Sequence, residues 1–302
     1  MVTMIIIVFQ IIYITMEYTY SPLMLDKSDM YRYKNVSSNK TRIPRIIHQI
    51  YVSSFRNSTI NSVIEMNKND FIYRGWPPDE IDGFVKQYEP AFYYQTYVNY
   101  QYQMQRIDSF RYVLMYHIGG IYINMDSGCE RSFKDLVVAL ESLDPDAMYL
   151  AAFPRGLKFA VDNDFSISST HHPFYRQLIS GLDIFNRDHM LYFWTSSFDT
   201  GPGYVYIQHR FFSSSKEAVV RLIDSSVHRP MLIRTENKDT WLSHDAHLLI
   251  YMDGKIKMLF SYYNIFLMMI IIYIMIIWDK QKKFYHLFAR IMRTMNRINT
   301  YF

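Results

Sequence analysis

The chain has 302 residues, which is enough for one α/β domain of ordinary size with short additional segments. Its single cysteine, Cys129, excludes an intrachain disulfide and a zinc site built from cysteines. Much of the formal net charge of +4 comes from 280–297, and the remainder is nearly balanced with no basic patch at motif spacing, which argues against a nucleic acid partner.

An uncharged apolar segment, Met1 to Met16, begins the chain and is followed by Glu17. It is slightly short for a spanning helix, which needs about 20 apolar residues, and it lacks the basic start of a secretion signal. Because small residues are missing at a cleavage position, we interpret residues 1–20 as a signal-anchor. A cleaved signal and an unrelated hydrophobic element are the alternatives. Residues 21–41 are polar and are interpreted as a stem.

An α/β pattern follows the stem. The apolar run at 43–52 is rich in β-branched residues and predicts a buried strand. A second strand is predicted at 71–76. The apolar residues of 79–88 share one face at helical spacing, so we expect a helix there.

The stretch 102–135 carries the most informative pattern. Apolar residues recur at helical spacing from Ile107 to His117, and Gly119-Gly120 supplies a stop. Asp108 and Arg111 are three residues apart in this helix and therefore share a face. Taken alone, the pair could equally be an exposed ion pair, which contributes little to stability.

A short apolar strand at 121–123 comes next, and Asn124-Met125-Asp126 lies at its end. A helix, a glycine break, a buried strand and an acidic tip predict a site at the carboxyl edge of a parallel sheet, where ligands of open α/β sheets bind. Asp126 is the only carboxylate of the three. Asn124 offers a neutral amide oxygen, which holds a cation more weakly.

Such an edge suits sugar-nucleotide chemistry. Transfer of a sugar from a nucleotide diphosphate leaves a diphosphate, whose charge a divalent cation can stabilise. Hard cations such as Mn²⁺ or Mg²⁺ prefer carboxylate and carbonyl oxygens. Two oxygen-bearing side chains at a strand end can share such a metal and the nucleotide ribose.

A second uncharged apolar segment, Met258 to Trp278, has the length to span a bilayer, with aromatic residues near both ends for the interfaces. The basic tail 279–302 follows, and the positive-inside rule places it in the cytosol. A buried core helix is the alternative. If both ends span, the α/β domain expected at 42–255 faces the lumen.

Several sequence blocks occur in a fixed order between about 40 and 250. They are I-P-R-I-I-H-Q-I at 43–50, R-I-D-S-F-R-Y-V-L-M-Y-H-I-G-G-I-Y-I-N-M-D-S-G-C at 106–129, V-D-N-D at 161–164, H-P-F at 172–174, T-G-P at 200–202 and W-L-S-H-D-A at 241–246. Together they resemble the DXD-containing fungal mannosyltransferase family. That family includes the initiating outer-chain mannosyltransferase and the inositol phosphorylceramide mannosyltransferases. The C-terminal anchor and short length look most like the sphingolipid branch.

This resemblance implies a GT-A-type fold with a Rossmann-like mixed sheet, and a role for each matching residue. Asp108 would hydrogen-bond the hydroxyls of the donor sugar. Arg111 would contact the sugar or the diphosphate. Asn124 and Asp126 would stand where the D-x-D pair of the family holds the metal and the ribose.

The remaining matches imply the borders of the site. His48 and Gln49 would border the nucleotide pocket, although His48 could also be a core histidine with both nitrogens satisfied. Asn163-Asp164 would lie near the transferred sugar or the acceptor, with Asp164 among the catalytic residues. His244 and Asp245 would complete the metal and diphosphate end.

Two positions depart from the family pattern. Asn124 replaces the first aspartate of D-x-D, and Leu242 replaces a histidine after Trp241, with His244 two residues further on. Both changes imply a lower affinity for the metal. A catalytically inactive homologue is therefore an alternative.

We predict a glycosyltransferase of a secretory-pathway membrane such as the Golgi, with a lumenal catalytic domain. The resemblance implies transfer of mannose from GDP-mannose with retention, aided by Mn²⁺ or Mg²⁺, to a glycolipid such as inositol phosphorylceramide. One alternative is a mannosyltransferase acting on protein N-glycans. Another, motivated by Asn124, is a regulatory subunit that binds an active transferase.

Overall fold

The computed structural model describes residues 20–33, 41–50, 58–124, 126–156, 161–187 and 192–234. The two apolar segments expected as membrane anchors, Met1 to Met16 and Met258 to Trp278, lie outside these residues, as do the basic tail 279–302, His244 and Asp245. Among the described residues, no helix combines the length and apolarity needed to cross a bilayer.

Nine strands are found in the described part of the chain. They are β1 (Leu23–Leu25), β2 (Ile46–Ile50), β3 (Ile72–Trp76), β4 (Gly120–Ile123), β5 (Ser127–Cys129), β6 (Tyr149–Pro154), β7 (Phe165–Ser168), β8 (Ala218–Ile223) and β9 (Leu232–Arg234). A seven-stranded sheet has the order β1-β8-β6-β7-β4-β2-β3, and β5 pairs with β9 in a small second sheet. Within the large sheet β7 runs antiparallel to both neighbours, whereas the other pairs are parallel. The expected mixed α/β fold is therefore confirmed.

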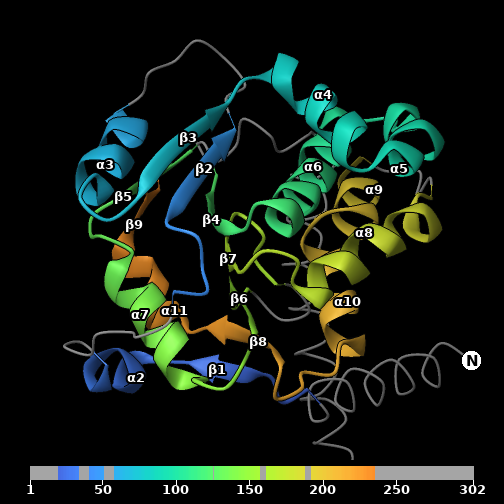
Figure 1. Ribbon diagram of the computed structural model, residues 1–302. Helices are drawn as coiled ribbons and strands as arrows, with labels where there is room; N and C mark the ends of the chain where they lie inside the picture. Colours follow the sequence, from blue (N-terminus) through green and yellow to red (C-terminus); the bar gives the residue numbers. More distant parts are fainter. Residues whose placement is uncertain are drawn as a thin grey trace, which may run out of the picture. The chain divides into compact units, whose positions relative to one another are not determined.

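Helices cover both faces of this sheet (Figure 1). They are α2 (Lys27–Arg32), α3 (Ser58–Asn67), α4 (Pro78–Tyr88), α5 (Pro90–Gln95), α6 (Gln103–His117), α7 (Lys134–Leu143), α8 (Pro173–Phe185), α9 (Tyr192–Asp199), α10 (Pro202–Phe211) and α11 (Ser225–His228), with 3-10 turns η1 (Tyr97–Asn99) and η2 (Arg229–Met231). Figure 1 shows α4, α5, α6, α8, α9 and α10 on one side and α2, α3, α7 and α11 on the other. Each side buries its own apolar core against the sheet.

Sequence periodicity located the elements around the expected site. The strand expected at 43–52 is β2, and the one expected at 71–76 is β3. Helix α4 begins with Pro78 at a position where a missing N–H costs nothing, and Asp79 in its first turn suits the helix dipole. Helix α6 and strand β4 likewise confirm the helix, the glycine break and the strand predicted from 102–135.

Part of the stretch expected as a stem belongs to the fold. Leu23–Leu25 forms β1, which lies parallel to β8 at one edge of the sheet. Asp26 then caps α2, because its carboxylate accepts hydrogen bonds from the backbone N–H groups of Ser28 and Asp29. A three-residue apolar run is too short to show strand periodicity, and its partner strand lies far along the chain, so sequence patterns could not identify it.

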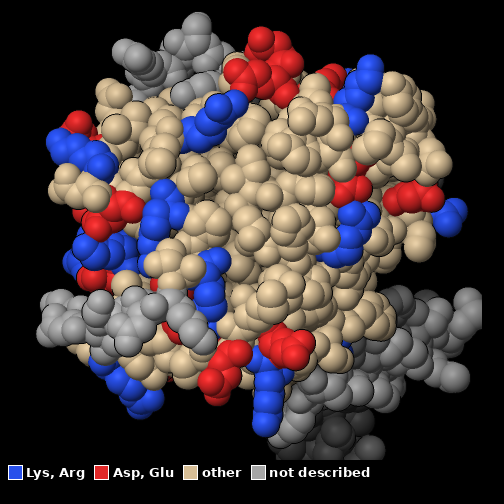
Figure 2. Space-filling view, viewed as in Figure 1, with Lys and Arg blue, Asp and Glu red and all other residues tan. Residues whose placement is uncertain are grey.

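Exposed charged side chains contribute little to holding these layers together. On the face seen in Figure 2, basic and acidic residues are interspersed around a broad uncharged area. Exposed ion pairs such as Lys68 with Glu65, at 2.6 Å, and Arg74 with Glu80, at 2.7 Å, are worth at most about 1 kcal/mol each. The two apolar cores therefore dominate the stability of the fold.

The Gly119-Gly120 break is required by both conformation and space. Gly119 has φ of 70° and Gly120 has φ of 98°, a region that side-chain-bearing residues rarely adopt. A Cβ atom on Gly120 would lie 2.5 Å from the carbonyl oxygen of Ile46 in β2. The pair thus lets α6 end and β4 start directly against β2.

We expect Gly120→Ala to lower the free energy of unfolding by at least about 2 kcal/mol, since the new methyl group must displace the β2 backbone. Thermal unfolding followed by circular dichroism measures the change. Gly83→Ala in α4 is the matched control, because a Cβ there meets nothing within 4 Å and should add about 0.5–1 kcal/mol of helix stability. Equal melting temperatures for Gly120→Ala and the wild type would contradict the close approach of the two strands.

Candidate active site

The Asp108–Arg111 pair lies at the centre of the candidate site. Both residues belong to α6, three positions apart, and an Arg111 guanidinium nitrogen lies 3.0 Å from Asp108 Oδ1. Asp108 is 4% exposed and Arg111 is 3% exposed. The alternative of an exposed ion pair is therefore wrong, because the helical face they share is covered by other elements.

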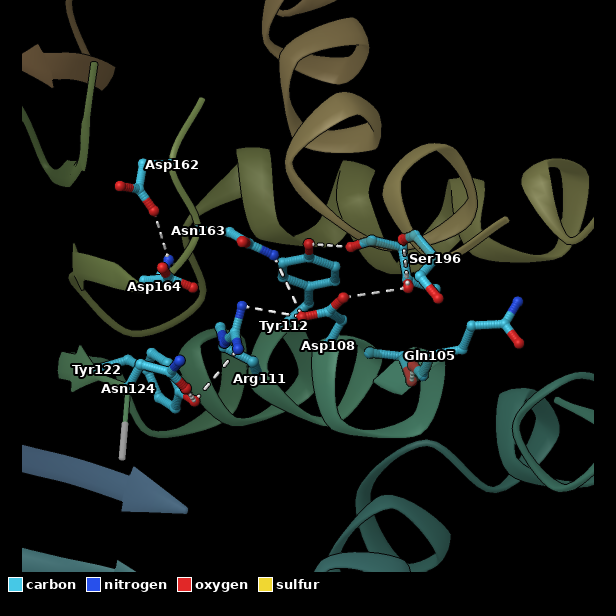
Figure 3. A network of polar contacts seen from close by, with 12 residues as sticks. Gln105, Asp108, Arg111, Tyr112, Tyr122, Asn124, Asp162, Asn163, Asp164 and Ser196 are labelled. Atoms are coloured by element: carbon cyan, nitrogen blue, oxygen red, sulfur yellow. Dashed lines mark hydrogen bonds and ion pairs between the residues drawn. The ribbon is translucent and has the colours of Figure 1, made fainter. Parts of the chain in front are cut away.

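Residues from two distant sequence blocks meet the Asp108 carboxylate. Asn163, just before β7, donates from Nδ2 to Oδ1 at 3.2 Å, and Thr200, just before α10, donates from Oγ1 to Oδ2 at 3.3 Å. Figure 3 shows Arg111 and Asn163 both directed at this carboxylate. Blocks that are separated by up to 92 residues thus converge on one buried carboxylate.

On its other side, Arg111 contacts Tyr122 of β4. A guanidinium nitrogen donates to the Tyr122 hydroxyl at 3.2 Å, and the guanidinium carbon lies 4.4 Å from the ring centroid. The Tyr122 hydroxyl in turn donates to Asn124 Oδ1 at 3.4 Å. A continuous polar chain therefore links Asp108 through Arg111 and Tyr122 to the tip of β4.

Burial controls the protonation of this chain. It raises the pKa of Asp108 to about 6, although the Arg111 charge and the hydrogen bonds from Thr200 and Asn163 act in the opposite direction. Burial alone would lower the pKa of Arg111, but the neighbouring Tyr122 and Asp108 raise it above its ordinary value, so the guanidinium stays charged. Burial also raises the pKa of Tyr122, which keeps its proton.

Gln49 supports the turn that carries Asn124 and Asp126. Its Nε2 donates to the carbonyl oxygens of Asn124, at 2.9 Å, and Ser127, at 3.1 Å, while its Oε1 accepts from the Tyr73 hydroxyl at 3.0 Å. The side chain is completely buried. Gln49 was expected to border a nucleotide. In this structure it acts on the site through the backbone of the turn.

His48 has both ring nitrogens engaged within the protein. The Trp76 indole donates to Nδ1 at 3.1 Å, and Nε2 lies 3.0 Å from the carbonyl oxygen of Gly119. The ring is therefore neutral, and burial lowers the pKa of His48 to about 4. The core-histidine alternative agrees with this geometry. His48 is also among the residues that line a hollow of about 540 Å³ between β3 and α4, most of which are apolar or aromatic.

The acidic residues Asp126 and Asp164 are both half-buried near the end of β4. Asp126 is half-buried and accepts a hydrogen bond from Ser127 Oγ at 3.3 Å. Asp164 lies beside Asn124 because β7 runs antiparallel to β4, and the Asn124 N–H donates to the Asp164 carbonyl oxygen at 2.7 Å. The structure thus brings the predicted residues Asp108, Arg111, Asn124 and Asp164 together around the end of β4.

The described residues do not by themselves form a metal site. No group of three or more histidine, cysteine, aspartate or glutamate residues in the described ranges could hold an ion. Of the expected ligands, Asn124 and Asp126 are described, whereas His244 and Asp245 are outside. Asn124 Oδ1 already accepts a hydrogen bond from the Tyr122 hydroxyl. A cation here would rest first on Asp126 and would need further oxygens, such as those of a diphosphate.

A second layer of buried polar contacts was not expected from the sequence. Gln105 donates to Asp199 at 2.9 Å, and the Tyr112 hydroxyl donates to the Thr200 carbonyl oxygen. These contacts hold the α9–α10 corner against α6. Gln105, Asp108 and Tyr112 recur at helical spacing on a largely buried helix, and this polar stripe is the signal that could have identified them.

Comparison with known proteins identifies a family whose description fits part of the chain and several similar proteins. Residues 53–144 match the family described as glycosyltransferase sugar-binding region containing DXD motif. The chain is 29% identical over 218 residues to mannosyl phosphorylinositol ceramide synthase CSH1 of Saccharomyces cerevisiae, covering 68% of this chain and 55% of the relative. It is 24% identical over 245 residues to inositol phosphoceramide mannosyltransferase 1 of Schizosaccharomyces pombe, covering 78% and 74%.

These matches confirm the resemblance inferred from the sequence blocks. The chain spans about half the length of the first two relatives that it matches, both from Saccharomyces cerevisiae. Among solved structures, the PaToxG glycosyltransferase aligns with a TM-score of 0.40 at 15% identity, covering 61% of this chain and 74% of that one. A likeness at that level does not identify the fold.

Proposed function

We propose that this chain is a retaining glycosyltransferase that transfers mannose from GDP-mannose to the head group of inositol phosphorylceramide. The names of the relatives support this reaction, because two are called mannosyl phosphorylinositol ceramide synthases and one is called an inositol phosphoceramide mannosyltransferase. In a retaining transfer the acceptor hydroxyl can attack on the face from which the nucleotide leaves, so the protein needs no nucleophile of its own.

The observation that carries the proposal is the convergence on Asp108. Three sequence blocks that resemble the family supply Arg111, Asn163 and Thr200 to one buried carboxylate. Such preorganised polar groups in a dry site suit recognition of sugar hydroxyls and of a diphosphate. The half-buried Asp126, with Mn²⁺ or Mg²⁺ when bound, would supply the charge that stabilises the leaving diphosphate.

The proposed function includes two membrane anchors. Segments 1–20 and 258–278 would hold the domain at 42–255 against a Golgi or other secretory-pathway membrane, with a cytosolic C-terminus. A lipid acceptor in that membrane would then be presented directly to the site. Asn124 favours one rival, a catalytically inactive homologue that serves as a regulatory subunit.

The direct test is sugar transfer by the full-length chain in detergent. GDP-mannose is compared with UDP-sugars, each with and without Mn²⁺, and acceptors are inositol phosphorylceramide and a high-mannose N-glycan. Transfer of mannose to the lipid alone supports the proposal. Transfer to the glycan alone would instead establish the N-glycan alternative. Binding of GDP-mannose without transfer to either acceptor would favour the regulatory subunit.

Transfer activity is expected to fall on the acid side of about pH 6. Below the raised pKa of Asp108 its carboxyl is protonated and Arg111 loses its charge partner, so activity should drop by about tenfold per pH unit. Asn163→Ala should move this acid limb to higher pH, because the Asn163 hydrogen bond lowers the pKa of Asp108. Initial rates between pH 4.5 and 8 measure both profiles. Identical limbs in the two proteins would assign the ionisation to another group.

A further inference from the structure

Helix α9 exposes aromatic side chains and buries polar ones. Trp194 is 46% exposed and Phe198 is 41% exposed, and their spacing of four residues places both on one face of the helix. The buried residues of α9 are Thr195, Ser196 and Asp199. A helix on the surface of a water-soluble domain normally has the opposite arrangement, with its apolar side inward. The outer face of α9 is therefore suited to an apolar environment.

The polar side of α9 is held in place by the candidate site. Asp199 accepts hydrogen bonds from Gln105 Nε2, at 2.9 Å, and from the backbone N–H of Arg187, at 3.2 Å. Thr200, which directly follows, donates to the Asp108 carboxylate at 3.3 Å. Turning the aromatic side of α9 inward would break these buried contacts, at a cost in free energy for each group left unpaired. The aromatic face therefore stays outward, next to the site.

The aromatic face of α9 lies along the same side of α10 as the start of the described chain. Gly203, Tyr206 and Arg210 recur at helical spacing and share one face of α10. A Cβ atom on Gly203 would lie 2.8 Å from the Phe198 ring, so this ring covers the beginning of that face. At the other end of the face, the Tyr20 ring lies 5.2 Å from the Tyr206 ring and 5.4 Å from the Arg210 guanidinium carbon.

Tyr20 locates the bilayer, because the proposed N-terminal anchor, 1–20, ends at this residue. Its hydroxyl lies 3.0 Å from His209 Nδ1, which fixes the end of the anchor to α10. Phe198 and Tyr20 are separated by about two turns of α10, or about 10 Å. Interfacial helices bury their apolar faces about 5–10 Å deep, and aromatic residues are favoured at that depth. A bilayer that holds the anchor is therefore within reach of α9.

We propose that the outer face of α9, formed by Trp194 and Phe198, is a membrane-contact surface that enters the interfacial layer of the bilayer holding the lipid acceptor. This inference rests on the proposed function and specifies how the acceptor is reached. Thr200, which contacts Asp108, lies only two residues beyond Phe198. A lipid head group at the bilayer surface could then enter the site while its apolar chains stay in the membrane.

Fluorescence quenching of Trp194 tests the membrane contact without relying on catalysis. The full-length chain is reconstituted into phosphatidylcholine vesicles, with and without bromine on the acyl chains near the ester groups. The difference between the wild type and Trp194→Phe isolates the Trp194 signal from that of the other tryptophans. We expect the brominated lipid to reduce this difference signal by about half or more. An unchanged signal would overturn the inference.

Transfer kinetics test whether the contact serves the acceptor. In the double variant Trp194→Ser with Phe198→Ser, the apparent KM for inositol phosphorylceramide in vesicles should rise by about tenfold or more, because two aromatic side chains no longer enter the bilayer. The KM for GDP-mannose should change by less than about twofold, as should the rate with a water-soluble inositol phosphodiester that has no acyl chains. Serine has nearly the helix propensity of tryptophan and phenylalanine, so α9 should persist, and thermal melting verifies the fold.

Two matched variants separate apolar contact from general damage. Trp194→Leu with Phe198→Leu keeps an apolar face and should restore most of the affinity for the lipid acceptor. Tyr31→Ser removes an aromatic side chain that is 76% exposed in α2, on the opposite side of the sheet from α9 (Figure 1), and should match the wild type.

The outcomes distinguish this inference from the proposed function. Transfer by the wild type with an equal KM for the lipid in the serine variant would overturn the membrane contact and leave the function standing. Quenching of Trp194 without transfer to any acceptor would overturn the function and leave the contact standing. If the serine substitutions instead dissociate a dimer in detergent and the lipid does not quench Trp194, the face binds a second copy of the chain, and the inference is wrong.

Discussion

Replacing Asp108 with alanine is expected to abolish sugar transfer and to lower the free energy of unfolding by about 3–5 kcal/mol. The alanine leaves the Arg111 guanidinium, which is 3% exposed, without its counter-charge. It also removes the acceptor for Asn163 and Thr200, whose hydrogen bonds hold the start of β7 and the α9–α10 corner against α6. Both the burial of an unpaired charge and the loss of two hydrogen bonds act in the same direction.

Chemical denaturation of the full-length variants measures this effect. Asp183→Ala is a matched control, because Asp183 is an exposed aspartate with one hydrogen bond from Thr96, and we expect its removal to cost less than about 1 kcal/mol. Asp108→Asn should be milder than alanine, since the amide oxygen can still accept from its neighbours. In the double variant Asp108→Asn with Arg111→Met, the unpaired charge is gone, so part of the stability should return. If Asp108→Ala unfolds together with the control, the buried pair does not stabilise the fold as argued.

Residues near one another in sequence were predicted well around this pair. The apolar spacing of α6, the glycine stop and the short strand β4 are all local patterns with strong periodicity. The shared face of Asp108 and Arg111 also follows from helical spacing alone. Their burial did not follow, because it depends on α8 and α9, which come from sequence far beyond α6.

The resemblance to a family predicted which residues gather, but not what each one contacts. Asn163 and Thr200 meet Asp108 through antiparallel β7 and the α9–α10 corner, and no periodic pattern reports those long-range placements. His48 and Gln49 are adjacent in the block at 43–50, so the resemblance implies that both border the nucleotide pocket. Neighbouring residues on a strand point to opposite faces. Accordingly, Gln49 donates a hydrogen bond to the backbone of the turn at Asn124, whereas His48 lies in the core and accepts a hydrogen bond from Trp76.

Asp126→Ala is expected to reduce kcat/KM for sugar transfer by about a thousandfold. The fold should stay intact, because Asp126 is only half-buried. Asp126 is the only carboxylate of the turn after β4, and Gln49 donates hydrogen bonds to two backbone carbonyl oxygens of that turn. A preorganised carboxylate at this position would hold the cation that stabilises the developing diphosphate charge. Its loss removes transition-state stabilisation, so kcat should fall more than the affinity for GDP-mannose.

Initial rates at saturating and subsaturating GDP-mannose, over a range of Mn²⁺ concentrations, separate these quantities. Glu130→Ala is the control, since Glu130 is an exposed carboxylate four residues further along and should retain wild-type rates. Asp126→Asn should resemble Asp126→Ala, because an amide keeps the volume but lacks the charge that the cation needs. Partial rescue of Asp126→Ala by high Mn²⁺ would agree with weakened metal binding. Wild-type rates in Asp126→Ala, or an equal loss in Glu130→Ala, would mean that the cation is held elsewhere and that the tip of β4 does not contribute the catalytic charge.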